Sequence, residues 1–195
     1  MEPIILASES KRRHDFFRLL DLPFTSFPSN VDESFDPRME ASSVVKELAE
    51  RKVKKILETL DTEKFSWVCG ADTLITLDGK YYGKPEDRAD AANMLRCFQG
   101  RKHQVITGIT LYNGKKKTFD SRSVISEVSF ASLSDKEIDW YLDSGEWQGV
   151  AGSYQIQGLA SCLINAINGS FSSIMGLPLR EFYVMLRDNG YPFGV

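Results

Sequence analysis

Apolar residues along this chain of 195 residues follow two patterns, compact runs and longer stretches with helical spacing. The runs are typical of strands, in which successive or alternate side chains are buried against a core. The predicted strands are 3–7, 24–27, 67–77 and 81–83, with one hairpin inside 104–130 and another inside 159–173. Asp-Gly and Asn-Gly pairs mark the turns, because these residues tolerate the positive φ of two-residue hairpin loops. They stand at 78–79, 113–114 and 168–169.

Apolar residues three and four positions apart predict helices between these strands. The first helix starts near Ser10, with Ser8 or Ser10 as its N-cap. Its apolar face is formed by Phe16, Phe17, Leu19 and Leu20. The remaining helices are predicted at 43–60, 86–100, 134–145 and 178–189. A capping box at 134–137 and glycines after several of the helices support these limits.

Strands and helices are interleaved, but several neighbouring strands form hairpins, so the sheet is expected to be mixed rather than purely parallel. The chain has no internal repeat and no linker-like segment. The fold class predicted is therefore α/β, a single domain over 1–195 with a long, twisted mixed sheet flanked by helices. Two lobes around a cleft stay open as an alternative form of the same fold.

Composition limits the partners. Hydrophobic residues make up 42% and charged residues 26% of the chain, and the net charge is −3. These values are typical of a soluble globular protein and favour neither nucleic acid nor a membrane as partner. No signal peptide and no apolar run long enough to span a bilayer is visible. Cys69, Cys97 and Cys162 form no CxxC pair and are expected to be packing residues of a reduced, cytoplasmic protein.

Several common catalytic motifs are missing from the sequence. His14 and His103 are the only histidines, which excludes HExxH and disfavours a His-rich metal site. The patterns GxxxxGK[ST], GxGxxG and GxSxG do not occur, so P-loop, Rossmann and α/β-hydrolase chemistry lack their usual motifs. Any catalysis is therefore expected to depend on carboxylates, lysines, arginines and a hard metal ion.

The stretch SESKRR (8–13) lies between a predicted strand and a predicted helix. Ser8, Ser10, Arg12 and Arg13 would place hydroxyls, backbone N–H groups and guanidinium groups at a helix N-terminus, which suits an anion. Two cations there oppose the helix macrodipole by roughly 0.3–1 kcal/mol each, and a bound anion would remove that conflict. The alternative is a capped helix with a solvated basic first turn.

A second feature is GADTLITLDGKYYGKP (70–85), which places Asp72 at the start of an apolar strand and Lys84 just past the following turn. Both residues and the 8–13 loop are expected at strand ends, where α/β sheets bind ligands. Carboxylates that activate water or bind a divalent ion, together with cations that bind phosphates, suit metal-assisted attack on a phosphoric anhydride. An Asx-type turn at Asp72 is the purely structural alternative.

Three further positions are ambiguous from spacing alone. Asp32 and Glu33 are adjacent acids in a polar loop, which are usually solvated. Lys52 lies on a helix face rich in cations, and Gln157 lies in a Gly-flanked segment, GSYQIQG (152–158). A buried glutamine can recognise base edges because its amide has both a donor and an acceptor.

Taken together, these motifs resemble those of the Maf family of nucleoside triphosphate pyrophosphatases, whose fold is related to inosine triphosphate pyrophosphatases. The resemblance extends over nearly the whole chain, and the order and spacing of the motifs support it. The similar segments are LASESKRR (6–13), VDE (31–33), LAERK (48–52), GADT (70–73), GKP (83–85), MLRCFQGRKHQVITG (94–108), AGSYQIQG (151–158) and MGLPL (175–179).

The resemblance implies hydrolysis between the α- and β-phosphates with Mg²⁺ or Mn²⁺, and it leaves a homodimer open. Asp72 would accept the proton of water, and Glu33 with Asp72 would hold the metal. Lys52 and Lys84 would bind phosphates and take part in catalysis. The remaining implied phosphate-binding residues are Ser8, Ser10 and Arg13, and those for substrate specificity are Arg12, Thr73 and Gln157, which match the dTTP/UTP subgroup.

The chain departs from the family pattern at two places that concern the site. Lys11 stands where the family has proline, and Gly149-Val150 stands where Asp-Lys is common. The second departure leaves room for a nucleotide-binding regulator of septum formation with little turnover, although Asp72, Glu33 and Lys84 are intact. A 7-methyl-GTP pyrophosphatase is the other alternative, and Thr73 and Gln157 disfavour it.

Overall fold

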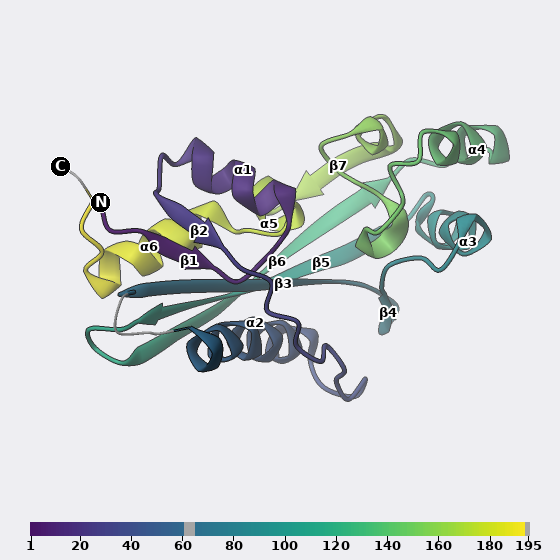
Figure 1. The fold of residues 1–195 in the computed structure, drawn as a ribbon. Helices are drawn as coiled ribbons and strands as arrows, with labels where there is room; N and C mark the ends of the chain where they lie inside the picture. Colours follow the sequence, from purple (N-terminus) through teal and green to yellow (C-terminus); the bar gives the residue numbers. More distant parts are fainter. Residues whose placement is uncertain (61–64, 194–195) are drawn as a thin grey trace. The chain divides into compact units, whose positions relative to one another are not determined.

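The computed structural model describes residues 1–60 and 65–193, in which strands and helices alternate (Figure 1). The strands are β1 (Ile4–Leu6), β2 (Phe24–Ser26), β3 (Trp67–Leu77), β4 (Lys80–Tyr82), β5 (Lys102–Asn113), β6 (Thr118–Phe130) and β7 (Ile164–Asn168). The helices are α1 (Lys11–Leu19), α2 (Ala41–Thr59), α3 (Arg88–Phe98), α4 (Asp135–Asp143), α5 (Phe171–Ile174) and α6 (Leu179–Asn189), with 3₁₀ turns at η2 (Ala151–Ser153) and η3 (Leu159–Leu163).

Within the described residues the strands form one seven-stranded sheet in the order β2-β1-β3-β5-β6-β7, with β4 paired to β3. Strand β1 runs parallel to β2 and to β3, whereas β3–β4 and β6–β7 are antiparallel. This mixed sheet with flanking helices confirms the predicted α/β class. None of the described helices is long and apolar enough to cross a membrane.

The described chain divides into two compact units. Unit 1 comprises Met1–Asp72, Thr107–Val124 and Gly176–Val195. Unit 2 comprises Thr73–Ile106 and Ile125–Met175. The long strands β3, β5 and β6 contribute residues to both units, and one functional domain over 1–195 stays a prediction.

In unit 1, helix α2 lies against one face of the strands while α1 and α6 lie on the opposite face (Figure 1). Two glycines allow α2 to approach the sheet closely. A Cβ atom at Gly70 of β3 would lie 2.6 Å from the carbonyl oxygen of Ala49, and one at Gly108 of β5 would lie 2.3 Å from that of Val45. Only a residue without a side chain fits at these two positions unless the helix backbone moves.

We expect Gly108→Ala to lower the free energy of unfolding by about 1–3 kcal/mol, because the new methyl group meets helix backbone that cannot rotate away. Urea denaturation measures the change. Gly83→Ala is the matched control, since beyond its two chain neighbours no atom of the described residues lies within 4 Å of the added Cβ. A Gly108→Ala protein as stable as the control would contradict the close contact between α2 and β5.

The core of unit 2 is a cluster under α3 and α4. His103 is buried in it, stacked on Phe98 with ring centroids 4.3 Å apart, and its Nε2 lies 2.8 Å from the hydroxyl of Tyr154. Burial lowers the pKa of His103 to about 4, so the ring is neutral at pH 7. The buried apolar residues of the cluster are Ile75, Leu77, Ala91, Ala92, Leu95, Phe98, Val105, Val128, Phe130, Leu133, Ile138, Tyr141, Leu142, Tyr154, Ile156, Ala160 and Leu163.

Local signals predicted most element limits. The capping box of Ser134 with Glu137 is present, and Gly190 ends α6 in the left-handed conformation with φ of 82°. The Asp78-Gly79 turn has positive φ at both residues, as the hairpin prediction requires. Helix α3 begins at Arg88, two residues later than predicted, because the Asp87 side chain caps the N–H of Asp90.

Three sequence-based predictions about the fold were wrong. The hairpin predicted inside 159–173 does not form, because β7 pairs with β6 instead and Ser170 caps α5 by accepting from the N–H of Ser173. Leu19, predicted on the apolar face of α1, is 71% exposed, since the buried side of this helix is formed by Phe16 and Phe17. The predicted packing role of the cysteines fits only one of them. Cys69 is buried, whereas Cys97 and Cys162 are exposed free thiols.

Candidate active site

Ser8 lies just past the end of β1, where the chain turns into α1. It is 8% exposed, and its Oγ accepts hydrogen bonds from the backbone N–H of Ser10 at 3.2 Å and from Nη1 of Arg13 at 3.0 Å. The Nε of Arg13 donates to the carbonyl oxygen of Gly176 at 2.8 Å. A guanidinium and a hydroxyl are thereby held beside the first turn of a helix, an arrangement that suits phosphate oxygens. The predicted grouping of these residues is present.

His14 contacts the backbone of this loop. The sequence patterns did not indicate that role for His14. Its Nε2 lies 3.1 Å from the carbonyl oxygen of Ser8 and 2.9 Å from Oγ of Ser26 on β2. The hydroxyl of Ser26 itself donates to the same carbonyl at 2.5 Å. The network fixes the backbone at Ser8 and so orients the hydroxyl that meets Arg13. Its only sequence signal is that His14 lies one helical turn after Ser10.

Asp72 is the sixth of the eleven residues of β3, not its first, which corrects the sequence-based placement at the start of the strand. The parallel neighbour β1 ends at Leu6, paired with Cys69, so Asp72 lies just beyond the end of β1 although β3 continues. The long strand continues because its second half pairs with β4. The candidate site therefore lies at the end of β1 but in the middle of β3.

Lys52 joins the two candidate carboxylates. Its Nζ lies 2.5 Å from Oδ1 of Asp72 and 2.7 Å from Oε1 of Glu33. Lys52 and Asp72 are each only 7% exposed. Gly70 and Asp72 are two positions apart and so face the same side of β3. The close approach of α2 at Gly70 is what brings Lys52 to Asp72.

Burial and charge act against each other at these groups. Burial raises the pKa of the Asp72 carboxyl, the neighbouring Lys52 and Arg13 oppose that rise, and Glu33 adds to it, with a raised pKa as the result. Burial lowers the pKa of Arg13, and the Asp72 carboxylate opposes it. A raised pKa brings a carboxylate closer to the proton affinity that a general base needs at neutral pH.

Two of the predicted site residues of unit 2, Lys84 and Gln157, lie on its loops. Lys84 is exposed directly after Gly83, whose carbonyl oxygen accepts from the N–H of Gly152 at 2.9 Å. Gln157 is exposed in the segment between η2 and η3, and its Nε2 donates to Oε1 of Gln155 at 2.9 Å. The bond between Gly83 and Gly152 connects the GKP turn to the segment that ends in Gln157.

Two predicted residues beside the main cluster are also placed. Thr73 directly follows Asp72 on β3 and is partly buried. Arg12, on the first turn of α1, is partly buried, and burial lowers its pKa. The roles predicted for Arg12, Thr73, Lys84 and Gln157 stay predictions.

The departures from the family pattern have local structural consequences. Gly149 has φ of 69°, a backbone conformation that a residue with a side chain rarely adopts. Val150 is 8% exposed and is therefore part of the apolar interior. Lys11 is exposed on the first turn of α1. Neither Gly149 nor Val150 replaces the charge of the lysine that the Asp-Lys pair of the family pattern would place here.

The donor set suits a hard cation that shares its ligands with substrate. In residues 1–60 and 65–193, no group of three or more His, Cys, Asp or Glu side chains lies together as a ready-made metal site. Asp72 and Glu33 meet at one ammonium group, and Mg²⁺ is usually bound by one or two protein carboxylates together with phosphate oxygens of the substrate. The two carboxylates therefore fit Mg²⁺ or Mn²⁺.

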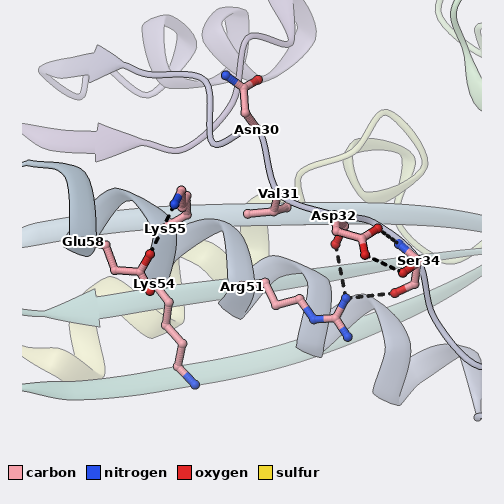
Figure 2. A pocket seen from close by; sticks show the side chains of 8 residues that line it. All are labelled: Asn30, Val31, Asp32, Ser34, Arg51, Lys54, Lys55 and Glu58. Atoms are coloured by element: carbon pink, nitrogen blue, oxygen red, sulfur yellow. Dashed lines mark hydrogen bonds and ion pairs between the residues drawn. The ribbon is translucent and has the colours of Figure 1, made fainter.

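A hollow of about 570 Å³ lies along the outer side of α2. Figure 2 shows the residues that line it, with Arg51 directed toward Asp32 and Ser34. Its cations are already engaged, since Lys54 pairs with Glu50 at 2.7 Å and Lys55 with Glu58 at 3.4 Å. The lining residues are Asn30, Val31, Asp32, Ser34, Arg51, Lys54, Lys55 and Glu58.

Known proteins similar to this chain include three named dTTP/UTP pyrophosphatase. That of Symbiobacterium thermophilum is 38% identical over 98% of this chain and 96% of its own length. The Fusobacterium nucleatum protein is 38% identical over 96% of both chains, and that of Hahella chejuensis is 39% identical over 96% of this chain and 92% of its own. Among solved structures, the Ham1 protein of Staphylococcus aureus gives a TM-score of 0.44 at 15% identity, covering 67% of this chain and 72% of that one.

A family model places the whole of this motif set in one family. The model described as Maf-like protein matches residues 3–189, a range that includes every candidate site residue from Ser8 to Gln157. The match agrees with the resemblance seen in the motifs and with the near-complete coverage of the named relatives. The chain belongs to the Maf-like protein family.

Proposed function

We propose that this protein hydrolyses nucleoside triphosphates between the α- and β-phosphates, with dTTP and UTP as preferred substrates. The observation that carries the proposal is the buried carboxylate of Asp72, whose Oδ1 lies 2.5 Å from Nζ of Lys52. The charge of Asp72 also opposes the effect of burial on the pKa of Arg13, so a second cation interacts with this carboxylate. A base beside two cations is what attack of water on a phosphoric anhydride requires. The names of relatives 38–39% identical over nearly the full chain support the substrate class.

In the proposed reaction Asp72 accepts a proton from the water that attacks the α-phosphorus. The new bond joins the water oxygen to that phosphorus, and the bond to the α–β bridging oxygen breaks, so that pyrophosphate leaves. Lys52 and Arg13 bind the phosphate oxygens whose charge increases in the transition state. Ser8 and Ser10, beside the N-terminus of α1, contact the same phosphates. Lys84 binds the leaving pyrophosphate.

Glu33 and Asp72 would hold a Mg²⁺ or Mn²⁺ ion, which supplies charge neutralisation at the phosphates when bound. Lys52 bridges both carboxylates in the free protein, contacting one oxygen of each, Oε1 of Glu33 and Oδ1 of Asp72. With substrate bound, Lys52 would bind a phosphate in place of the carboxylates. Its proposed role is to hold the two acids together in one state and the substrate in the other.

Base preference is assigned to Arg12, Thr73 and Gln157. The amide of Gln157 has both a donor and an acceptor and can match the edge of a pyrimidine. In this structure it bonds to Gln155, so base binding would replace one amide partner by another at small cost. A homodimer and a cytoplasmic location are further parts of the proposal.

Pyrophosphate release from dTTP, UTP, CTP, 7-methyl-GTP and ATP, each with and without Mg²⁺ or Mn²⁺, tests this function. We expect metal-dependent release that is fastest with dTTP and UTP. Faster release from 7-methyl-GTP would overturn the specificity and leave the chemistry. If none of the five is cleaved but dTTP still binds, the nucleotide-binding regulator becomes the better description, and the change at Gly149-Val150 its first explanation.

A further inference from the structure

Glu33 is unusually well placed for a side chain in an exposed loop. Its side chain is 57% exposed, and yet its Oε1 lies 2.7 Å from Nζ of the buried Lys52. Long side chains at exposed ion pairs lose conformational entropy when held in one geometry, which is why such pairs are weak when nothing else supports them. A contact that fixes the loop backbone around Glu33 therefore helps to keep its carboxylate at Lys52.

Arg51 makes the contacts that fix this backbone. Its Nη1 donates to the carbonyl oxygens of Asp32 at 3.2 Å and of Ser34 at 2.9 Å, the residues on either side of Glu33 (Figure 2). Its Nη2 donates to Oε1 of Glu47 at 2.6 Å, one turn earlier on α2. Glu47 holds the guanidinium in place, and the guanidinium holds the loop.

The loop is also closed on itself next to this contact. The Asp32 carboxylate accepts from the backbone N–H of Ser34 at 2.9 Å and from its hydroxyl at 2.7 Å. This turn brings the two carbonyl groups that flank Glu33 together, where one nitrogen can reach both of them. The planar, multi-donor guanidinium can serve Glu47 and both carbonyls at once, which the single ammonium of a lysine cannot do in the same geometry.

We propose that Arg51 is a positioning residue for Glu33: it fastens residues 32–34 to α2 so that the Glu33 carboxylate stays at Lys52. Arg51 and Lys52 are consecutive, so their side chains leave the helix about 100° apart. One of them points to the buried carboxylate, and the other to the outer side where the loop lies. One turn of α2 thereby contacts both Asp72, through Lys52, and the loop of residues 32–34, through Arg51.

The activity test of this inference rests on the proposed function, in which Glu33 holds the metal. The variants are Arg51→Gln, Glu33→Gln, the double variant, and Arg51→Lys. Loss of a group that orients a metal ligand typically weakens metal affinity about 10–100-fold. We expect Arg51→Gln to raise the Mg²⁺ concentration for half-maximal pyrophosphate release at least tenfold, to change the KM for dTTP much less, and to have no further effect in the Glu33→Gln background. Arg51→Lys is expected to restore only part of the wild-type metal response.

A second readout needs no activity. The ¹⁵N signal of the Lys52 Nζ in the free protein reports the Glu33 contact, and Arg51→Gln is expected to shift it in the same direction as Glu33→Gln. Backbone amides of 32–35 are expected to exchange faster with deuterium in Arg51→Gln. Arg38→Gln is the matched control, because Arg38 binds Asp36 at 2.6 Å in the same loop and its side chain is 88% exposed. It is expected to leave the Lys52 signal unchanged.

The outcomes separate the two proposals. Effects of Arg51→Gln that add fully to those of Glu33→Gln would overturn the positioning role, and so would a wild-type Lys52 signal in Arg51→Gln. If the wild-type protein releases no pyrophosphate from any substrate, the proposed function fails, while the Lys52 signal still decides whether Arg51 positions Glu33.

Discussion

We expect Asp72→Asn to lower the kcat for pyrophosphate release about 10²–10⁴-fold in a protein that still folds, the range typical for loss of a general base. The amide has the size of the carboxyl group and keeps an oxygen that can accept from Lys52, which lies 2.5 Å from Oδ1. It cannot take a proton from water. Steady-state release from dTTP at saturating Mg²⁺ measures the loss, and circular dichroism checks the fold.

The wild-type pH profile gives a second measure of the same role. A base must be deprotonated to act, so kcat/KM is expected to fall as pH decreases through the raised pKa of Asp72. The inflection therefore lies above the ordinary value for aspartate, and below it the rate falls tenfold per pH unit. In Asp72→Asn the residual rate should lack this inflection.

Asp78→Asn is the matched control. Asp78 is on the turn after the same strand, its side chain is 65% exposed, and it pairs with Arg101 at 2.5 Å. Its φ of 51° is also tolerated by asparagine, so the turn is kept. This variant is expected to stay within about twofold of wild-type activity, as surface ion pairs contribute little. Full activity in a folded Asp72→Asn protein would rule out Asp72 as the base.

The elements of the fold could be predicted where a few neighbouring residues determine the backbone. The Asp78-Gly79 turn, the Ser134 capping box and the Gly190 helix end each depend on chemistry within four residues. The hairpin predicted around Asn168-Gly169 failed because β7 has a partner far away in the sequence, β6, and Ser170 starts a helix instead. Strand pairing over long separations leaves no local signal.

The residues of the candidate site were harder to predict than the fold, because their contacts also join segments far apart in the sequence. Spacing alone gave no reason to choose Lys52 among the cations of its helix, and only the family resemblance named it. Its position depends on Gly70, which lets α2 touch β3, a contact between segments far apart in the chain. The role of Arg51 was not predicted at all. Its partners are backbone carbonyls of a loop, and because every residue has a carbonyl group, such partners leave no pattern in the sequence.

Lys52→Met is expected to destabilise the protein by about 3 kcal/mol at pH 8 and to abolish detectable turnover. Removing one partner of a buried ion pair costs about 3–5 kcal/mol because the other charge stays buried without compensation. The lower figure applies because the Arg13 charge still acts on Asp72. Methionine keeps most of the apolar stem, so the loss reflects charge more than packing. Urea denaturation at two pH values measures it.

The sign of the pH dependence identifies the cause of this loss. Lys52 lowers the pKa of Asp72 against the effect of burial, so in Lys52→Met that pKa rises further above its unfolded value. The folded state then binds the proton more tightly than the unfolded state, and stability is lost as pH rises from the unfolded pKa to the folded one. The variant should therefore be closest to wild type in acid, near pH 5, and weakest at pH 8.

The double variant Lys52→Met/Asp72→Asn separates charge from packing. It buries no unpaired charge at this position, so it should recover most of the stability lost in Lys52→Met while remaining inactive. If the double variant is as unstable as Lys52→Met, and neither responds to pH, the loss of stability does not come from an unpaired charge on Asp72. In that case the buried pair with Asp72 is not what holds α2 and β3 in register at the site.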